Sequence, residues 1–417
     1  MLLEHQELRQ RADYTHKFNV PSGRHGWLRL TPAYSLKVVE EILKDKDDRG
    51  AVLDPFSGTA TTGLSAAYHG HSSTCVEINP FLVWFGRAKV ARYSREDVIS
   101  FRNSASDAAR SALAAGTELS VAPSIHNIER WWSQPELEFL CGLRIEMERV
   151  QFGAACIRDL LQVAFCRTLI KLSNAAFNHQ SMSFKSAPQD DLLTEVEGKT
   201  KFAKIFLEDV EFVGQSAEDN PAGLCEIVEG DSRRLSGLLT RKFDLVITSP
   251  PYPNRMSYIR ELRPYMYWLG FLENGRDAGE LDWQKIGGTW GVATSRLTDW
   301  TPNRETYRPN YFQQMLVDVA AEANKNGQLL ANYIDKYFED IWLHLQGLCG
   351  VLGPQSEVHY IIGNSTFYGV LVPVERIYAD MLSQLGFTNV SIRALRKRNS
   401  KKELVEFDVS GVFGALA

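Results

Sequence analysis

The sequence predicts an α/β fold built on an open sheet, with a helical segment inserted into it. Five short apolar stretches end at or just before Gly, Pro, Asn or Asp, as buried parallel strands do. They are residues 51–54, 74–78, 225–231, 243–251 and 356–363. Segments of helical length separate several of them, and such alternation is typical of a parallel sheet covered by helices. Two further candidate strands, 388–395 and 403–410, flank a basic run and indicate a closing antiparallel hairpin.

The series of strands is interrupted between residues 92 and 222. Apolar residues recur there at helical spacing, so that Ile157 and Leu161, for example, share one face. We therefore expect three parts. Residues 1–91 hold an N-terminal segment and the first half of the sheet domain, 92–222 form a helical insertion, and 223–417 complete the sheet domain.

Two stretches of unusual composition accompany these parts. Residues 272–312 are rich in Gly, Thr, Asp and Trp, and we expect an irregular loop there, since a long loop inside a compact enzyme is usually functional or mobile. The pair Trp131 and Trp132 could form a platform for a substrate. Buried packing at a domain seam is the favoured interpretation.

Composition excludes several classes of protein. The chain has 417 residues and a formal net charge of −5, which rules out a globally basic nucleic-acid binder but leaves room for a local basic groove. The six cysteines form no CxxC pair and the histidines show no metal spacing, so we expect reduced thiols and no metal site. No apolar run is long enough for a membrane span, and charged residues at the start argue against a signal peptide. We expect a cytoplasmic protein with no membrane partner.

The first predicted strand runs directly into a loop of small residues, the glycine loop (residues 55–60). Small residues let the backbone approach a ligand and leave the first N–H groups of the following helix free to bind it. About twenty residues further on, Glu77 ends the next strand, where an acid can accept hydrogen bonds from both ribose hydroxyls. Together these features indicate an adenosine-type cofactor. The loop lacks GxGxxG and GK[ST], which disfavours a dinucleotide or a nucleoside triphosphate.

The predicted strand 243–248 leads into Ser249-Pro250-Pro251-Tyr252, the proline corner. Two prolines fix the backbone and remove two N–H donors, so the carbonyls of the corner form a rigid array of acceptors. A serine hydroxyl and a neighbouring carbonyl can both accept from an NH₂ group, and a tyrosine ring can stack on a planar base. The corner therefore suits an amino group on an aromatic ring. Methylation of cytosine C5 needs a thiol nucleophile, and no cysteine here follows a proline.

These motifs resemble those of the amino-group DNA methyltransferases, which use S-adenosyl-L-methionine to methylate cytosine N4 or adenine N6. LDPFSGTATTG resembles the family's cofactor loop, with Ala60 in place of its second glycine, and VEINP resembles its ribose motif. EGDSRRL resembles the third-strand motif, and HGWLRLTPAYS loosely resembles the segment that meets the methionine end. The resemblance covers about 25–92 and 223–410. It implies a Rossmann-like, seven-stranded S-adenosylmethionine-dependent methyltransferase sheet.

The resemblance also implies roles for single residues. Glu77 takes the ribose, and Asp231 contacts the adenine ring. The residues it assigns to the cofactor are Thr31, Asp54, Pro55, Phe56, Ser57, Gly58, Thr59, Thr61, Thr62, Glu77, Ile78, Asn79, Asp231 and Ser232. The catalytic residues are those of the proline corner: Ser249, Pro250, Pro251 and Tyr252.

In this family serine before PPY is typical of cytosine-N4 enzymes, whereas aspartate is usual for adenine-N6 enzymes. We therefore expect a site-specific DNA (cytosine-N4-specific) methyltransferase. Adenine N6, and less favoured an RNA base amine, remain the alternatives, beside a binding module that has lost catalysis. The implied partners are double-stranded DNA and a cognate restriction endonuclease that acts on the same site.

Basic residues near these motifs are candidates for DNA contacts. Arg396, Lys397 and Arg398 lie in the run between the two predicted hairpin strands, and Arg255 follows the proline corner. A base amine is occupied by its pairing partner inside the duplex, so the nucleotide must be flipped out and stacked on Tyr252. We further expect that the insertion and the stretch 272–312 read the DNA sequence together.

Overall fold

The computed structural model describes residues 8–30, 33–44, 46, 50–114, 119–149, 155–176, 183–184, 195–255, 257–289, 292–398 and 404–414. Its central feature is a seven-stranded sheet in the order β10-β11-β7-β6-β1-β2-β5. The strands are β1 (Ala51–Asp54), β2 (Ser72–Glu77), β5 (Cys225–Glu229), β6 (Phe243–Thr248), β7 (Leu352–Gly363), β10 (Phe387–Lys397) and β11 (Val405–Phe413).

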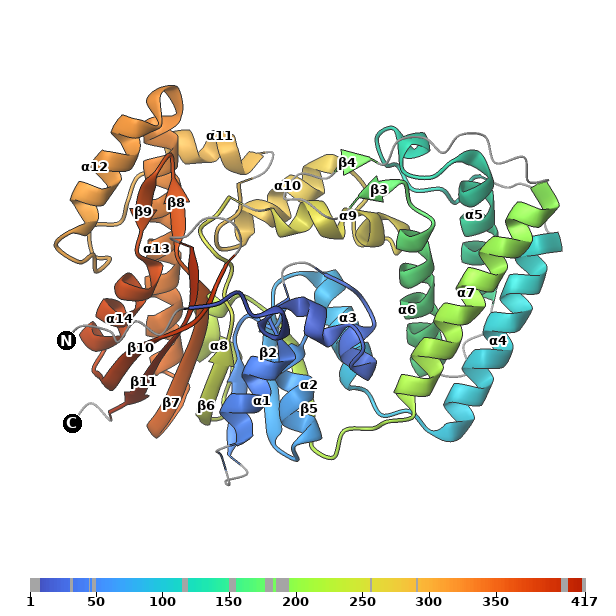
Figure 1. The fold of residues 1–417 in the computed structure, drawn as a ribbon, viewed down its shortest axis with the longest axis horizontal. Helices are drawn as coiled ribbons and strands as arrows, with labels where there is room; N and C mark the ends of the chain where they lie inside the picture. The colour runs from blue at the N-terminus through green and yellow to red at the C-terminus, as the bar shows by residue number, and fades with distance from the viewer. Residues whose placement is uncertain are drawn as a thin grey trace.

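All strands of this sheet are parallel except β11, which runs antiparallel to both of its neighbours. If the seven strands are numbered along the chain, their order in the sheet is 3-2-1-4-5-7-6, and strand 7 (β11) is the antiparallel one. This is the Rossmann-like methyltransferase arrangement. The predicted fold class is therefore confirmed. The seven strands expected from the sequence, including the closing hairpin, all form (Figure 1).

The two faces of the sheet pack against different helices, as the period of two along a strand requires. Val52 and Ile247 face α1 (Leu36–Lys44) in one hydrophobic cluster. Their neighbours Leu53 and Val246 belong to a second cluster with α13 (Gly327–Cys349). Both strands are therefore buried on both sides, which explains why their sequences are almost continuously apolar.

The other helices all follow β1 along the chain. They are α2 (Thr61–Tyr68), α3 (Pro80–Val90), α4 (Arg95–Ala114), α5 (Gln134–Arg149), α6 (Ala155–Lys171), α7 (Glu195–Ala217), α8 (Leu235–Leu238), α9 (Tyr258–Trp268), α10 (Gly275–Gln284), α11 (Val292–Asp299), α12 (Phe312–Glu322) and α14 (Val374–Gln384). The short elements are β3 (Ala175–Ala176), β4 (Ser183–Phe184), β8 (Ser365–Phe367), β9 (Val370–Val372), η1 (Ala12–Tyr14), η2 (His16–Asn19), η3 (Gly23–Gly26), η4 (Ile128–Arg130), η5 (Ser232–Arg234) and η6 (Asn324–Asn326). In the described part of the chain no helix is both long and apolar enough to cross a bilayer.

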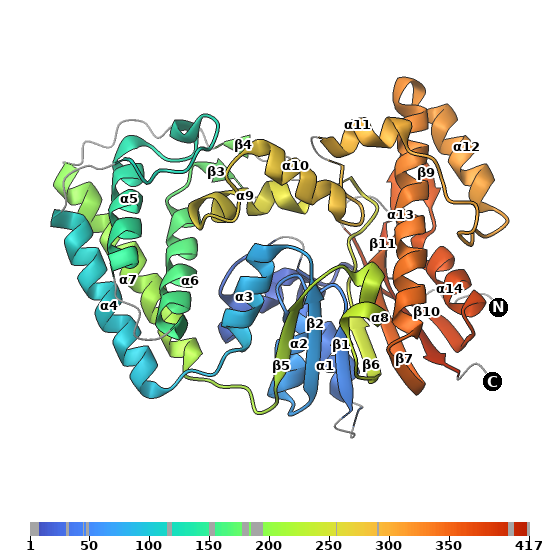
Figure 2. The same ribbon diagram turned by 180° about the vertical axis from the view of Figure 1, so that it is seen from behind.

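Helices α4 to α7 pack on one another to one side of the sheet, with α9 and α10 crossing between the two (Figures 1 and 2). Trp131 and Trp132 are 5% and 0% exposed, and the Trp132 indole N–H donates to the Leu169 carbonyl at 2.9 Å. Trp132 also meets Trp268 of α9 edge to face. The pair therefore serves packing, as the favoured interpretation held, and offers no open platform.

The stretch 272–312 differs from the expected irregular loop, because it contains α10 and α11. A capping box starts α10: the Asn274 side chain accepts from the Asp277 N–H, and the Asp277 carboxylate accepts from the Asn274 N–H. Asn and Asp favour such helix starts as strongly as they favour turns. Composition alone therefore could not distinguish a capped short helix from a loop.

Arg24 of η3 joins the inserted helices to the sheet domain. It is 1% exposed, and its guanidinium has acceptors from both ends of the inserted segment. These acceptors are the carbonyls of Lys89, Ala91, Ser216 and Ala217 and the side-chain oxygen of Asn220. Among the residues that the structure describes, no carboxylate forms an ion pair with Arg24, and the buried guanidinium is tolerated because these oxygens satisfy its donors.

Replacing Arg24 should therefore destabilise the protein strongly. Arg24→Ala leaves several buried carbonyls without donors, and we expect the free energy of unfolding to fall by about 3 to 5 kcal/mol. Chemical denaturation monitored by circular dichroism measures the change. The matched control is Arg110→Ala, because among the described residues Arg110 is exposed and pairs with the exposed Asp107. It should change stability by less than about 0.5 kcal/mol. Equal denaturation midpoints for the two variants would contradict the role given to Arg24.

Candidate active site

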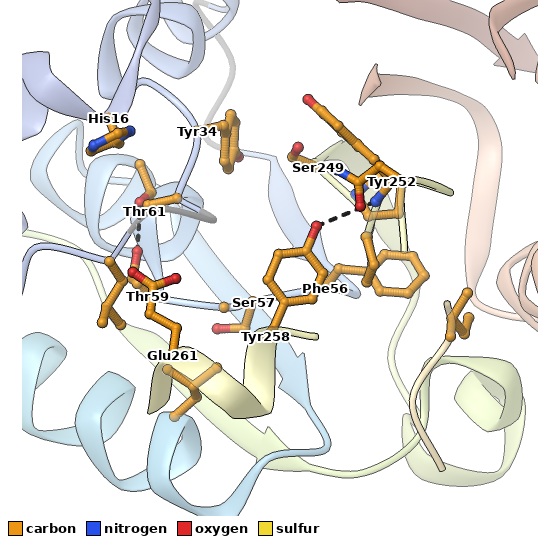
Figure 3. A pocket seen from close by; sticks show the side chains of 18 of the residues that line it. His16, Tyr34, Phe56, Ser57, Thr59, Thr61, Ser249, Tyr252, Tyr258 and Glu261 are labelled. Carbon is orange, nitrogen blue, oxygen red and sulfur yellow. Dashed lines mark hydrogen bonds between the residues drawn. The ribbon is translucent and has the colours of Figure 1, made fainter. Parts of the chain in front are cut away.

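The glycine loop and the proline corner line the same cavity, whose volume is about 940 Å³. The cavity lies at the carboxyl ends of the parallel strands, where ligands bind in open α/β sheets. Figure 3 shows Ser57 and Thr59 of the loop on one side and Ser249 and Tyr252 of the corner on another. A ligand bound on the loop would therefore share a compartment with a group held at the corner.

The glycine loop turns sharply through two residues with positive φ. Gly58 has φ 50° and Ala60 has φ 55°. The left-handed conformation costs a residue with a side chain about 1 kcal/mol, so Ala60 carries a small strain that a glycine at this position would avoid. A hydrogen bond from the protein interior also stabilises the loop, because the buried Lys89 ammonium donates to the Thr59 carbonyl. Burial lowers the pKa of Lys89 to about 7.

Glu77 at the end of β2 organises the loop. One carboxylate oxygen accepts from the Gly58 N–H at 2.8 Å, and the other accepts from the Asn79 N–H at 2.8 Å. Burial raises the pKa of Glu77, while Lys285 beside it and these N–H groups lower it. Each oxygen keeps a second lone pair, so both can still accept from a pair of hydroxyls.

Asp54 at the end of β1 lies between the loop and the corner. Its Oδ1 accepts from the Phe56 N–H at 3.0 Å and from the Thr248 hydroxyl at 2.6 Å. Its Oδ2 is buried and has no hydrogen-bond partner among the described residues. Burial raises the pKa of Asp54 to about 6. Asp54 is fully buried behind the cavity lining, so it joins the glycine loop to the proline corner rather than facing a ligand.

Asp231 and Ser232 form the wall at the end of β5. The Asp231 carboxylate accepts from Arg233 in a bidentate pair with distances of 2.7 to 3.0 Å, and Arg233 continues to Asp340 on α13 at 2.7 Å. The Ser232 carbonyl accepts from the His344 ring at 3.1 Å. Burial lowers the pKa of His344 to about 4, so its ring is neutral at pH 7. This wall is rigid and held from α13.

Hydrogen bonds to residues of several other elements hold the proline corner in place. The Ser249 hydroxyl donates to the Ile361 carbonyl at 2.9 Å, which leaves its oxygen lone pairs free to accept. The Pro251 carbonyl accepts from the Tyr337 hydroxyl at 2.8 Å. The Tyr252 N–H donates to the Tyr258 hydroxyl (Figure 3), and the Tyr252 hydroxyl donates to Glu406 at 3.0 Å. Burial and the Glu406 charge raise the pKa of Tyr252, so its phenol is neutral.

Most of the residues expected at the site do line this cavity. They are Pro55, Phe56, Ser57, Gly58, Thr59, Thr61, Glu77, Ile78, Asp231, Ser232 and the four residues of the proline corner. Asp54, Thr62 and Asn79 lie behind the lining: the Thr62 hydroxyl donates to the Ile247 carbonyl, and the Asn79 side chain caps α3. Thr31 lies outside the described residues.

The four residues expected to contact DNA occupy different positions. Arg255 is exposed, has a left-handed backbone (φ 59°), and lies just outside the cavity lining. Lys397 is half-buried and lines the cavity. Arg396 forms a bidentate ion pair with Glu406, and Arg398 lies over the Tyr252 ring at 4.8 Å. The phosphate contacts expected of these residues remain a prediction.

Several residues at the cavity had not been singled out from the sequence. Tyr34 hydrogen-bonds Thr62 and faces Ser249 across the cavity (Figure 3). It belongs to the loosely matched segment 25–35, which was the available signal. Tyr258, Lys285 and Glu406 also line the cavity. No local pattern marks these three, because only the folded chain brings them to the site.

Comparisons with known proteins identify a distant relative. The type II methyltransferase M.BsoBI of Geobacillus stearothermophilus is 21% identical over 458 residues, which cover 97% of this chain and 87% of that protein. No family model matches the sequence. Two structures of the rRNA methyltransferase aviRa from Streptomyces viridochromogenes align with 91% of this chain and 86% of theirs, at 11% identity and a TM-score of 0.28. That score is too low to support any conclusion. The chain is thus similar, over nearly its whole length, to a type II methyltransferase.

Asp54→Asn should raise the stability of the protein at neutral pH and weaken its binding of the cofactor, and the gain in stability should disappear at low pH. The folded-state pKa of about 6 exceeds the ordinary aspartate value of 3.8, so the folded protein holds this proton more tightly than the unfolded chain does. The stability due to the protonated form is present below pH 4 and is lost as pH rises through 6. Asn mimics the protonated form, so the variant should be more stable than the wild type by up to about 3 kcal/mol above pH 6 and nearly equal to it below pH 4.

Urea denaturation of both proteins between pH 4 and 8 measures this difference. Calorimetric titration at pH 7.5 should also show weaker binding of S-adenosylmethionine to Asp54→Asn, because a neutral acceptor holds the Phe56 N–H of the loop less tightly than a carboxylate does. Asp318→Asn, at an exposed position of α12, is the control and should bind the cofactor as the wild type does. A stability difference that is the same at pH 4 and pH 8 would refute the assignment.

Proposed function

We propose that this protein is an S-adenosylmethionine-dependent DNA methyltransferase that methylates the N4 amine of a flipped cytosine. The observation that carries the proposal is the shared cavity: the glycine loop and the proline corner line one compartment. Similarity to a type II methyltransferase supports the choice of DNA as substrate. The methyltransferase sheet supports the choice of cofactor.

The residues of the loop side fit this cofactor. Glu77 lines the cavity and offers two oxygens to the ribose hydroxyls, while Asp54 supports the loop from behind the lining. Asp231 and Ser232 bound the place of the adenine ring. When bound, S-adenosylmethionine supplies an electrophilic methyl group on a sulfonium. The protein's own part is to bind the cofactor and to exclude water around it.

At the corner, the chemistry is positioning of a weak nucleophile. An aromatic amine delocalises its lone pair into the ring, so it must be pyramidalised before it can attack. The Ser249 oxygen, whose proton is directed to Ile361, and a carbonyl of the corner can accept the two amine hydrogens and aim the lone pair. Tyr252 stacks on the base and offsets part of the few kcal/mol that extrusion from the duplex costs.

Two other substrates are kept as alternatives. Serine is a neutral acceptor and binds the amine of adenine as well as that of cytosine, so adenine N6 is the second candidate. A base amine in RNA is the third and least favoured. A restriction endonuclease that cuts the same site is the partner we propose beside double-stranded DNA. We also propose that α4 to α7 and the stretch with α10 and α11 contact the DNA around the flipped base.

The deciding experiment is a methylation assay with the purified full-length chain and radiolabelled S-adenosylmethionine. Mixed-sequence double-stranded DNA and transcribed RNA are the two substrates. Nuclease digestion and mass spectrometry should then find N4-methylcytosine in the DNA. N6-methyladenine would shift the proposal to the second candidate, and label in RNA alone would refute DNA as the substrate. No transfer to either nucleic acid, with S-adenosylmethionine bound, would refute the proposed activity.

Tyr252→Ala should separate catalysis from cofactor binding. Loss of stacking is expected to lower the single-turnover rate of methyl transfer by about 10- to 100-fold. The affinity for S-adenosylmethionine, measured by calorimetry, should change less than about twofold, since the affected contact is to the base. The control is Tyr368→Ala, whose side chain is 58% exposed in the turn between β8 and β9. A wild-type rate in Tyr252→Ala would exclude the stacking role.

A further inference from the structure

We propose that Glu406 of the closing hairpin is a positioning residue, which holds the Tyr252 ring in place for the flipped base. In this inference Arg396 and Arg398 act through the same tyrosine rather than on DNA phosphates. It rests on the proposed function, because Tyr252 must stack on a base for its position to matter. It concerns β10 and β11, where Glu406 was not singled out from the sequence and Arg396 was expected to contact DNA.

Glu406 lies at the centre of the arrangement and is only 4% exposed. Its Oε1 accepts from the Tyr252 hydroxyl at 3.0 Å and from Arg396 Nη2 at 3.1 Å. Its Oε2 accepts from Arg396 Nε at 2.7 Å. Arg396 and Glu406 are direct partners in the antiparallel register of β10 and β11. The strand pairing itself therefore brings the ion pair together.

The ion pair determines the strength of the contact with the tyrosine. A buried carboxylate without a cation would be destabilised by desolvation, and Arg396 prevents this by a bidentate contact. The contact with Arg396 orients the Glu406 carboxylate, and a hydrogen bond from a phenol to an ion-paired carboxylate is stronger than one to a neutral oxygen. The tip of the Tyr252 ring is fixed as a result.

Arg398 restrains the same ring from its face. Its guanidinium lies 4.8 Å from the ring centroid, and its Nη1 donates to the Asn364 carbonyl at 2.9 Å. Gly363 makes room for it, because a Cβ there would lie 2.3 Å from the same nitrogen. A cation over an aromatic ring is attracted to its face, which restrains the orientation of the ring. The hydroxyl, the ring face and the backbone N–H of Tyr252 therefore all have partners before a substrate binds.

This preorganisation has a kinetic meaning. A free tyrosine would lose rotational freedom when the base stacks on it, whereas a fixed ring has already lost that freedom on folding. Glu406 occupies the Nε and Nη2 donors of Arg396 and balances its positive charge, so the pair attracts a DNA phosphate less than a free arginine would. A phosphate contact therefore predicts a change in the salt dependence of DNA binding, and a positioning role predicts a change in turnover.

A double-mutant cycle tests the proposal on the full-length protein. Glu406→Ala and Tyr252→Phe remove the same hydrogen bond from its two sides, so each should lower kcat by about tenfold. The double variant should be no slower than either single one, because the bond can be lost only once. Glu406→Gln keeps an acceptor oxygen and should retain more activity than Glu406→Ala. KM for DNA, the affinity for S-adenosylmethionine and the salt slope of DNA binding should stay at wild-type values.

Three results would overturn the inference. They are wild-type kcat in Glu406→Ala, additive losses in the double variant, or a salt slope in Arg396→Ala that falls by about one unit with kcat unchanged, which is the signature of a lost phosphate contact. Circular dichroism verifies that each variant is folded, and the conservative Glu406→Gln and Tyr252→Phe keep the comparison valid if Glu406→Ala is unstable. If the wild type methylates DNA and Glu406→Ala has the same kcat, this inference is refuted but the proposed function is not. A wild-type protein without any transfer would refute the proposed function and this inference with it.

Discussion

The site depends on the parallel pairing of β1 with β6. The two strands lie side by side in the middle of the sheet, with Leu53 opposite Val246, so their carboxyl ends emerge together. The glycine loop leaves one end and the proline corner leaves the other. The Asp54 to Thr248 hydrogen bond joins the two exits. Nearly two hundred residues separate these motifs along the chain, yet strand order makes them neighbours.

Much of this could be predicted because strand, loop and corner are local in sequence. The glycine loop must follow a strand and start a helix, and the prolines must follow a strand that ends, so each motif carries its own structural context. The carboxyl ends of parallel strands then meet at one edge of the sheet. That is why most of the expected residues, from Pro55 to Tyr252, line a single cavity.

What could not be predicted depends on contacts between distant parts of the chain. Arg396 looked like a free cation beside a turn, whereas hairpin register pairs it with Glu406. Lys285 reaches Glu77 only because α10 folds over the sheet edge. Helix α10 was missed because Asn274 and Asp277, which cap its start, are equally typical of turns. In each case the deciding partner lies too far along the sequence, or the local signal has two meanings.

Arg24 gives the molecule a property that reaches beyond its stability. One guanidinium binds carbonyls at both boundaries of the α4 to α7 bundle, so the chain leaves the sheet domain and returns to it at almost the same point. A segment whose two ends meet can change in length or shape without pulling on the strands around it. The bundle can therefore differ in length or shape while the strands beside the cavity keep their arrangement, provided that Arg24 retains its contacts at the junction.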